Sequence, residues 1–150
     1  EARALFSKLD AVQSVANGRA ALAYLKALPD SNGKVGAVGF CWGGAMANQL
    51  AVHAPDLNAA VSFYGMAPDT ALVPQIKAHV QLHYAGLDER INASREGYEA
   101  ALKAAGIAFE SYLYEGKQHA FHNDVNVARY DQASAELAWK RTLDLFKRTL

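Results

Sequence analysis

Apolar residues change their spacing several times along the chain, and each change predicts a new element. From Ala2 to Leu28 they recur at helical spacing, which predicts one helix, or two short helices separated near Asn17 and Gly18. Turn residues at 29–33 then precede a run of β-branched and small residues at 34–40, which is typical of a short buried strand. The first part of the chain therefore predicts helix followed by strand.

The same alternation continues to the carboxyl end. The predicted strands cover residues 57–65, 78–86 and 107–116, and the predicted helices cover 43–55, 92–106 and about 129–149, with loops at 68–77 (including one helical turn) and 117–127. Strands that alternate with helices indicate an α/β fold with a mainly parallel sheet and helices on both faces. No internal repeat or linker interrupts the pattern, so residues 1–150 are expected to form a single domain.

Composition narrows the classes of partner. Lysine plus arginine and aspartate plus glutamate number 15 each, so no basic field predicts binding to nucleic acid or to an anionic membrane. No apolar run approaches the roughly 20 residues of a membrane-spanning helix, and the first residues lack the pattern of a signal peptide. We expect a soluble protein, with a cytoplasmic location favoured, although a single cysteine leaves the compartment open.

That single cysteine lies in the segment GFCWGG, between a predicted strand and a predicted helix. A nucleophile on such a sharp turn has a strained backbone and needs small neighbours two residues before and after it, and Gly39 and Gly43 supply them around Cys41. The dipole of the following helix would favour the thiolate. A glycine-rich turn with an inert cysteine and a phosphate-binding loop remain alternatives, although the third glycine of the dinucleotide pattern is absent.

A nucleophilic cysteine needs a base, and the base needs an acid that orients it. Asp88 follows the third predicted strand and His119 follows the fourth. Because the carboxyl ends of parallel strands meet at one edge of a sheet, we expect Cys41, Asp88 and His119 to lie together. Glu89 is an alternative acid at a less favourable position after the strand.

The remaining histidines have weaker support. His53 lies late in a helix, as surface residues do, and His79 and His83 alternate along a strand, as packed or edge residues do. His122 and Asp124 could join His119 in a metal site, but no further ligand completes the set nearby, so we expect no metal. Aromatic residues at the strand ends fit either ordinary core or an apolar acyl pocket: Trp42, Phe63, Tyr64, Tyr84 and Phe121.

Taken together, these segments resemble the dienelactone hydrolases, a branch of the α/β-hydrolase superfamily with a cysteine nucleophile. The resemblance rests on GFCWGG, AAVSFYG, AGLDERI and HAFHND, in this order, within residues 34–150. It implies a partial α/β-hydrolase fold and a triad of Cys41, Asp88 and His119 that opens lactones or cleaves small esters through a thiol ester, without metal or organic cofactor. It also implies that the backbone N–H of Trp42 belongs to the oxyanion hole.

One departure from the family pattern concerns the substrate. The member that hydrolyses dienelactone carries an arginine four residues after the histidine, where this chain has Asn123, and Arg90 is another cation that could face the site. The expected substrate pocket is therefore formed by Tyr64, Arg90, Phe121 and Asn123. A thioesterase or general esterase on the same triad, and a non-catalytic thiol-bearing binding domain or inactive remnant, remain alternatives.

A second departure concerns the amino terminus. Family members have several strands before the helix with which this chain begins, so we expect those strands, and the second oxyanion donor that follows one of them, to lie upstream of Glu1. The strand at 35–40 would then be an exposed edge. We expect this edge to be covered, for instance by pairing in a homodimer.

Overall fold

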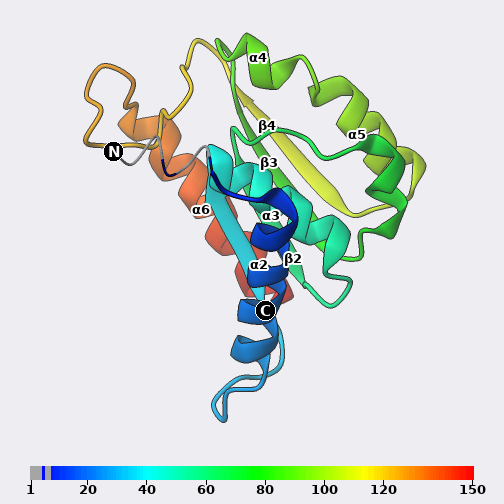
Figure 1. Cartoon of the computed structure of the whole chain (residues 1–150). Helices are drawn as coiled ribbons and strands as arrows, with labels where there is room; N and C mark the ends of the chain where they lie inside the picture. Colours follow the sequence, from blue (N-terminus) through cyan, green and yellow to red (C-terminus); the bar gives the residue numbers. More distant parts are fainter. Residues whose placement is uncertain (1–4, 6–7) are drawn as a thin grey trace.

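The computed structural model of the chain describes Leu5 and residues 8–150, and it contains a four-stranded sheet between helices (Figure 1). The strands are β1 (Gly36–Phe40), β2 (Ala59–Phe63), β3 (His79–Ala85) and β4 (Phe109–Tyr114). The helices are α2 (Ala11–Lys26), α3 (Trp42–His53), α4 (Glu89–Asn92), α5 (Arg95–Ala104) and α6 (Gln132–Thr149), with a short 3-10 helix, η1 (Thr70–Gln75). The predicted α/β class is confirmed.

All four strands pair in parallel, in the order β1-β2-β3-β4. The register sets Phe40 beside Phe63, Phe63 beside His83, and His83 beside Tyr112. The carboxyl ends of the strands consequently meet at one edge of the sheet, where open α/β sheets bind their ligands. The segments that follow β1, β3 and β4 emerge together at this edge.

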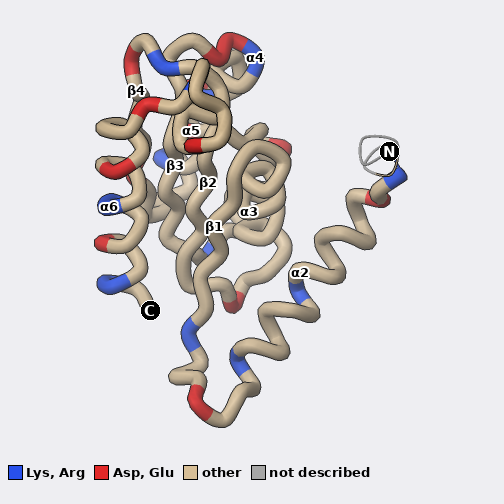
Figure 2. Tube along the Cα trace, turned by 90° about the vertical axis from the view of Figure 1, so that its left-hand side faces the viewer, with Lys and Arg blue, Asp and Glu red and all other residues tan. Residues whose placement is uncertain are grey.

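Two apolar clusters attach the helices, one on each face of the sheet. On one face, α3, α5 and η1 bury side chains that include Val52, Ile76, Tyr98 and Leu102. On the other face, α6 buries Ala138 and Leu145 against Phe63 and Phe121. Figure 2 shows α6 and α3 on opposite sides of the strands. The expected cover of helices on both faces is therefore confirmed, and the burial of these apolar side chains is the main force that stabilises the layers.

Helix α2 packs on α3 through its carboxyl-terminal part, where Leu22 is buried, and diverges from α3 toward its amino end (Figure 2). Asp10 caps it by accepting the N–H of Gln13 at 2.7 Å, so the helix begins at Ala11. It continues without a break through Gly18, so the chain forms one helix here. A Cβ on Gly18 would lie 2.9 Å from the Leu50 side chain, so the glycine allows close packing of α2 on α3. Most of the predicted residues before Leu9 lie outside the described part of the chain.

Strand β1 is an edge of the sheet as far as the chain is described, and Val38 and Phe40 on it are each 37% exposed. An edge strand presents unpaired backbone groups that can pair with another chain. Pairing with a second copy stays a prediction.

Two helix boundaries differ from the predicted ones. The helix predicted at 92–106 is α5, which begins at Arg95, and a separate short helix that was not predicted, α4, precedes it and begins where Asp88 accepts the N–H of Ile91. The last helix starts at Gln132, because Asp131 caps it by accepting the N–H of Ser134 at 2.9 Å. Side-chain caps fix both starts, whereas apolar spacing alone does not locate them.

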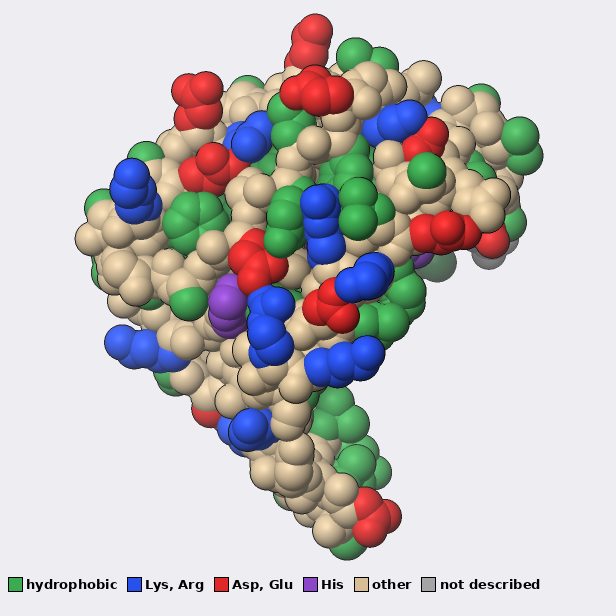
Figure 3. Space-filling model, turned by 180° about the vertical axis from the view of Figure 1, so that it is seen from behind, with side chains coloured by type: hydrophobic (Ala, Val, Ile, Leu, Met, Phe, Trp, Pro, Cys, Tyr) green, Lys and Arg blue, Asp and Glu red, His purple; other side chains and the backbone are tan. Residues whose placement is uncertain are grey.

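The surface has no dominant charge on the face seen in Figure 3. Basic and acidic side chains are intermixed there, in keeping with the net formal charge of zero. Among the described helices, none is long and apolar enough to cross a membrane.

Candidate active site

Cys41 lies on a strained turn between β1 and α3. Its φ of 54° and ψ of −116° are rarely adopted by a residue with a side chain, and its N–H donates to the carbonyl of Phe63 at 3.1 Å. A Cβ on Gly39 would lie 1.9 Å from the carbonyl oxygen of Gly43, so only glycine fits at position 39. A Cβ on Gly43 would meet nothing within 4 Å. The expected need for small residues on both sides of the cysteine therefore holds for Gly39 and is wrong for Gly43.

A second close approach holds the same helix against the sheet. A Cβ on Gly44 would lie 2.7 Å from the carbonyl oxygen of Phe63, and a Cβ on Gly65 would lie 2.3 Å from the carbonyl carbon of Gly44. The start of α3 thus packs backbone to backbone on the turn after β2. Sequence reasoning missed this contact, although the extra glycine after the elbow and the glycine that ends FYG were its signals.

Cys41, His119 and Asp88 lie in hydrogen-bond reach of one another. His119 Nε2 is 3.1 Å from Cys41 Sγ, and His119 Nδ1 is 2.5 Å from Asp88 Oδ2. A carboxylate oxygen accepts, so His119 donates from Nδ1 and its Nε2 is left to accept from the thiol. Asp88 is only 8% exposed, which shields its bond to the imidazole from water. The alternative acid, Glu89, is exposed and begins α4.

Hydrogen bonds join the acid-bearing loop directly to the histidine-bearing loop. The N–H of Leu87 donates to the carbonyl of Lys117 at 2.9 Å, and the N–H of Gly86 donates to the carbonyl of Tyr114 at 2.9 Å. The Lys117 ammonium in turn bonds the Asp131 carboxylate at 2.7 Å, which ties the loop to the start of α6. These contacts hold the two loops beside each other, next to the Asp88–His119 pair.

The electrostatic surroundings favour the protonated thiol at rest. Burial raises the pKa of Cys41 above its ordinary value of 9.0, and the negative charge of Asp88 adds to this, while the guanidinium groups of Arg129 and Arg90 oppose it. The expectation of a resting thiolate is therefore wrong in direction. The thiol S–H and the free Nε2 of His119 form a matched donor and acceptor, so proton removal can accompany attack.

A hollow of about 190 Å³ opens over the thiol. Its walls are Cys41, Trp42, Ala45, Tyr64, Met66, Arg90, Ile91 and His119. The Tyr64 ring lies 4.8 Å from the His119 ring, so it backs the imidazole. Burial and the nearby Cys41 raise the pKa of Tyr64, which keeps its hydroxyl neutral. Two of the four expected pocket residues, Tyr64 and Arg90, thus line the hollow.

The other two expected pocket residues do not line it. Phe121 is fully buried, with its ring 5.5 Å from that of Tyr64, so it supports the wall from behind. Asn123 is exposed, and its Oδ1 accepts the N–H of Val125 at 3.3 Å within the same loop. Sequence spacing could not separate residues that line the hollow from residues that pack behind it, because both kinds follow strand ends.

Backbone strain gathers around the hollow. In the described part of the chain, the non-glycine residues with φ in the left-handed region are Cys41, Tyr64 and Ala120, at 54°, 39° and 69°. Two of them line the hollow and the third follows His119. Such conformations persist only where the surrounding packing enforces them, and they cluster at functional sites.

The remaining histidines lie in other surroundings. His53 lines a larger hollow of about 430 Å³ between α2 and α3 and does not line the one over Cys41. His122 packs between the rings of Phe40 and Trp139, at 5.1 Å and 5.9 Å. No group of three or more potential metal ligands occurs in the described ranges, 5 and 8–150.

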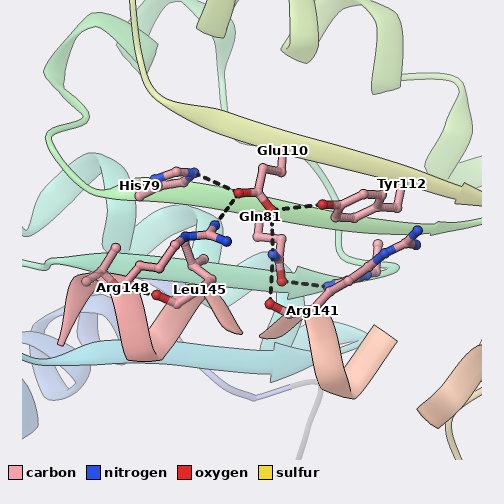
Figure 4. A network of polar contacts seen from close by, with 9 residues as sticks. His79, Gln81, Glu110, Tyr112, Arg141, Leu145 and Arg148 are labelled. Carbon is pink, nitrogen blue, oxygen red and sulfur yellow. Dashed lines mark hydrogen bonds and ion pairs between the residues drawn. The ribbon is translucent and has the colours of Figure 1, made fainter. Parts of the chain in front are cut away.

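His79 belongs to a separate polar network between β3, β4 and α6 (Figure 4), and His83 joins this network through Gln81. Glu110 is its centre: it accepts from Gln81 and Tyr112, each at 2.9 Å, and from Arg148. His79 Nε2 lies 3.6 Å from the same carboxylate. His83 is fully buried and bonds the Tyr114 hydroxyl at 2.9 Å and Gln81 Oε1 at 3.0 Å. The structure thus brings Cys41, Asp88 and His119 together and leaves the strand histidines in a network without a nucleophile.

Comparisons with known proteins identify the family of the chain. The family model of the dienelactone hydrolase family matches residues 1–150. The chain is 32% identical over 146 residues to a carboxymethylenebutenolidase of Pseudomonas putida, covering 96% of this chain and 61% of that protein. The chain spans about half the length of the curated relatives that it matches, from 44% to 61%.

Solved structures share the fold. A dienelactone hydrolase from Anabaena variabilis superposes with a TM-score of 0.68 at 26% identity, covering 91% of this chain and 59% of that one. A dienelactone hydrolase-like promiscuous phosphotriesterase from metagenomic libraries superposes with a TM-score of 0.84 at 23% identity, covering 93% and 63%, and supports the fold alone.

Proposed function

Because this chain belongs to the dienelactone hydrolase family, we propose that it hydrolyses lactones or small carboxylic esters through Cys41, His119 and Asp88. The observation that carries the proposal is the continuous chain of contacts from carboxylate to imidazole to thiol, beside an open hollow. A thiol held 3.1 Å from an imidazole nitrogen, with the opposite nitrogen bonded to a carboxylate, is the arrangement of an activated nucleophile.

The proposed reaction starts with the neutral thiol. As Sγ attacks the carbonyl carbon, its proton moves to His119 Nε2, and the imidazolium so formed is stabilised by Asp88. The tetrahedral intermediate collapses, the carbon–oxygen bond to the leaving group breaks, and His119 returns the proton to that oxygen. Water then attacks the thiol ester with His119 as base, which releases the acid and restores the thiol.

Trp42 is the residue best situated to stabilise the oxyanion. It follows Cys41 directly and is the first residue of α3, so its backbone N–H lies at the positive end of the helix dipole. Loss of one such donor typically costs about 10²- to 10³-fold in kcat.

Two cations bear on the choice of substrate. Arg90 lines the hollow, and both Arg90 and Arg129 act on the charge of Cys41, while both side chains are exposed and form no ion pair within the described residues. Sequence reasoning missed Arg129. We therefore propose a preference for esters or lactones that carry a carboxylate. Replacing Arg90 with glutamine should raise KM for an anionic ester several-fold more than KM for a neutral ester of the same size.

The rival with the same machinery is a thioesterase or general esterase. The specific observation in its favour is that Asn123, where the dienelactone-hydrolysing member has arginine, lies outside the hollow. Comparing kcat/KM for a lactone, a p-nitrophenyl ester and an acyl thiol ester separates the two.

The experiment that tests the proposal is hydrolysis of p-nitrophenyl acetate and of a simple lactone by the chain, with Cys41→Ala and Asp88→Asn beside it. Circular dichroism controls for folding. Turnover that falls in both variants supports the triad. Turnover that persists in Cys41→Ala, or folded wild-type protein that turns over none of these substrates, contradicts it.

A further inference from the structure

The loop that carries the acid of the site is tied by a side chain that takes no part in the proposed chemistry. Asn92, the last residue of α4, reaches back to the turn that leaves β3. Its Nδ2 donates to the carbonyl of Ala85 at 2.9 Å and to the carbonyl of Gly86 at 3.3 Å. Ala85 is the last residue of β3, and Gly86 follows it, two residues before Asp88. Asn92 therefore closes the loop across its base.

The backbone of Asn92 closes the same loop a second time. Its N–H donates to the carbonyl of Asp88 at 2.9 Å, and the N–H of Asp88 donates to the carbonyl of Ala85 at 3.0 Å. The carbonyl of Ala85 thus accepts from both Asp88 and Asn92. The side chain of Asn92 thus bonds the turn ahead of Asp88, and its main chain bonds Asp88 itself, so the backbone that carries the carboxylate is held at two points.

The local bond of Asp88 is weak by comparison. Its Oδ1 accepts the N–H of Ile91 at 3.4 Å, which is a long hydrogen bond, while its Oδ2 is 2.5 Å from His119. The cap on α4 alone is therefore a poor constraint on the direction of the carboxylate. The stronger constraint is the position of the backbone that Asn92 holds.

Asparagine at position 92 leaves one polar atom without a partner, so its benefit lies in the donor group, Nδ2. Asn92 Oδ1 is buried and has no hydrogen-bond partner within the described residues. A buried acceptor without a partner typically costs about 1–3 kcal/mol. An apolar residue would avoid this cost but would leave the carbonyls of Ala85 and Gly86 without the amide that they accept from.

We propose that Asn92 is a positioning residue for the reaction: by clamping the turn between Ala85 and Asp88, it sets the short bond from Asp88 to His119. This inference rests on the proposed function for its kinetic consequence only, since the bond itself exists without substrate. Misplacing a catalytic group by about 1 Å can cost on the order of 10²-fold in rate.

The test compares Asn92→Ala with a matched asparagine at the opposite edge of the sheet. Asn58 is also half-buried and bonds the backbone, accepting the N–H of Val35 at 2.9 Å ahead of β1 and β2. Each variant is measured by the strongly deshielded proton resonance of the His119 Nδ1–H, by kcat and KM for p-nitrophenyl acetate, and by urea unfolding. Asn92→Ser, which keeps a hydroxyl donor, serves if the alanine variant does not fold.

We expect Asn92→Ala to move or broaden the His119 proton resonance and to lower kcat about 10- to 100-fold, with KM within about twofold. Asn58→Ala should lower stability without moving the resonance. An unmoved resonance and unchanged kcat in folded Asn92→Ala, or an equal movement in Asn58→Ala, would overturn the proposal. A resonance that moves only in the Asn92 variant, in a protein without turnover, supports the positioning role and contradicts the proposed function instead.

Discussion

The molecule contains two histidine–carboxylate pairs in contrasting surroundings. His119 and Asp88 lie on loops after β4 and β3, 2.5 Å apart, beside a thiol and an open hollow. His79 and Glu110 lie within regular strands, 3.6 Å apart, in a network with Arg148, Gln81 and Tyr112 (Figure 4). Both pairs join β3 or its loop to β4 or its loop. A histidine and a carboxylate therefore meet at each end of the β3–β4 pair, with different neighbours at the two ends.

The two pairs differ in the number of hydrogen-bond donors around the carboxylate. Glu110 has several donors, and the bonds from Gln81 and Tyr112, together with the charges of Arg148 and His79, lower its pKa although burial opposes this. Asp88 has one strong partner, and His119 keeps one nitrogen for the thiol. A carboxylate surrounded by several donors stabilises a fold, whereas a pair that leaves one acceptor facing a nucleophile can move a proton.

The largest expected effect is on activity. His119→Ala should lower kcat/KM by about 10³-fold or more, because the thiol then has no base, whereas His79→Ala should leave it within about twofold. Ester hydrolysis by the two folded variants measures this. A comparable loss of kcat/KM in His119→Ala and His79→Ala would contradict the proposal that only His119 acts as the base.

The next effect is on the pH dependence of stability. Burial, and then the charges of Arg141 and His122, lower the pKa of His83 from 6.5 to about 3. Below pH 6.5 His83 therefore becomes protonated in the unfolded chain but stays neutral in the folded chain. Its contribution to the free energy of unfolding is fully present above pH 6.5 and is lost as the pH falls toward 3. The loss should reach about 3 kcal/mol at pH 4.

Urea unfolding at pH 7 and pH 4 tests this value. His83→Gln removes the titration, so the variant should be less stable at pH 7 but should lose less stability between the two pH values. Equal losses in wild type and variant would contradict the assignment.

A smaller effect separates the two carboxylates by stability. Glu110→Ala removes several hydrogen bonds around a part-buried carboxylate and should lower the free energy of unfolding by about 2 kcal/mol. Asp88→Asn keeps the shape of the side chain and should cost less than half of this. Chemical denaturation measures the free energy of unfolding of the two variants. A larger loss in Asp88→Asn than in Glu110→Ala would contradict this order.

The smallest effect concerns the reactivity of the thiol. The charge of Asp88 raises the pKa of Cys41, so Asp88→Asn should shift the midpoint of iodoacetamide alkylation to lower pH, and Arg90→Gln should shift it to higher pH. Glu110→Gln is the matched control and should leave the midpoint unchanged. A midpoint already near neutral pH in the wild type would contradict a resting thiol.

The order of elements and the clustering of Cys41, Asp88 and His119 could be predicted from the sequence, because both follow from local patterns and strand order. Strand and helix spacing, turn residues and the glycines around Cys41 are local, and the rule that parallel strands end at one edge converts positions such as Asp88 and His119 into a cluster. Segment boundaries such as the starts of α4 and α6 escaped this reasoning, because single side-chain caps decide them.

The sequence by itself determined the α/β class, the strand-to-helix turn at Cys41 and the chain order Cys41, Asp88, His119, since these follow from periodicity and from chain order. Only the tertiary structure decided which aromatic residues line the hollow, that Gly39 rather than Gly43 is sterically required, and that burial raises the pKa of Cys41. It also decided that Asn92 clamps the acid loop. Burial, distance and hydrogen-bond partners arise between segments far apart in the chain, and no local pattern encodes them.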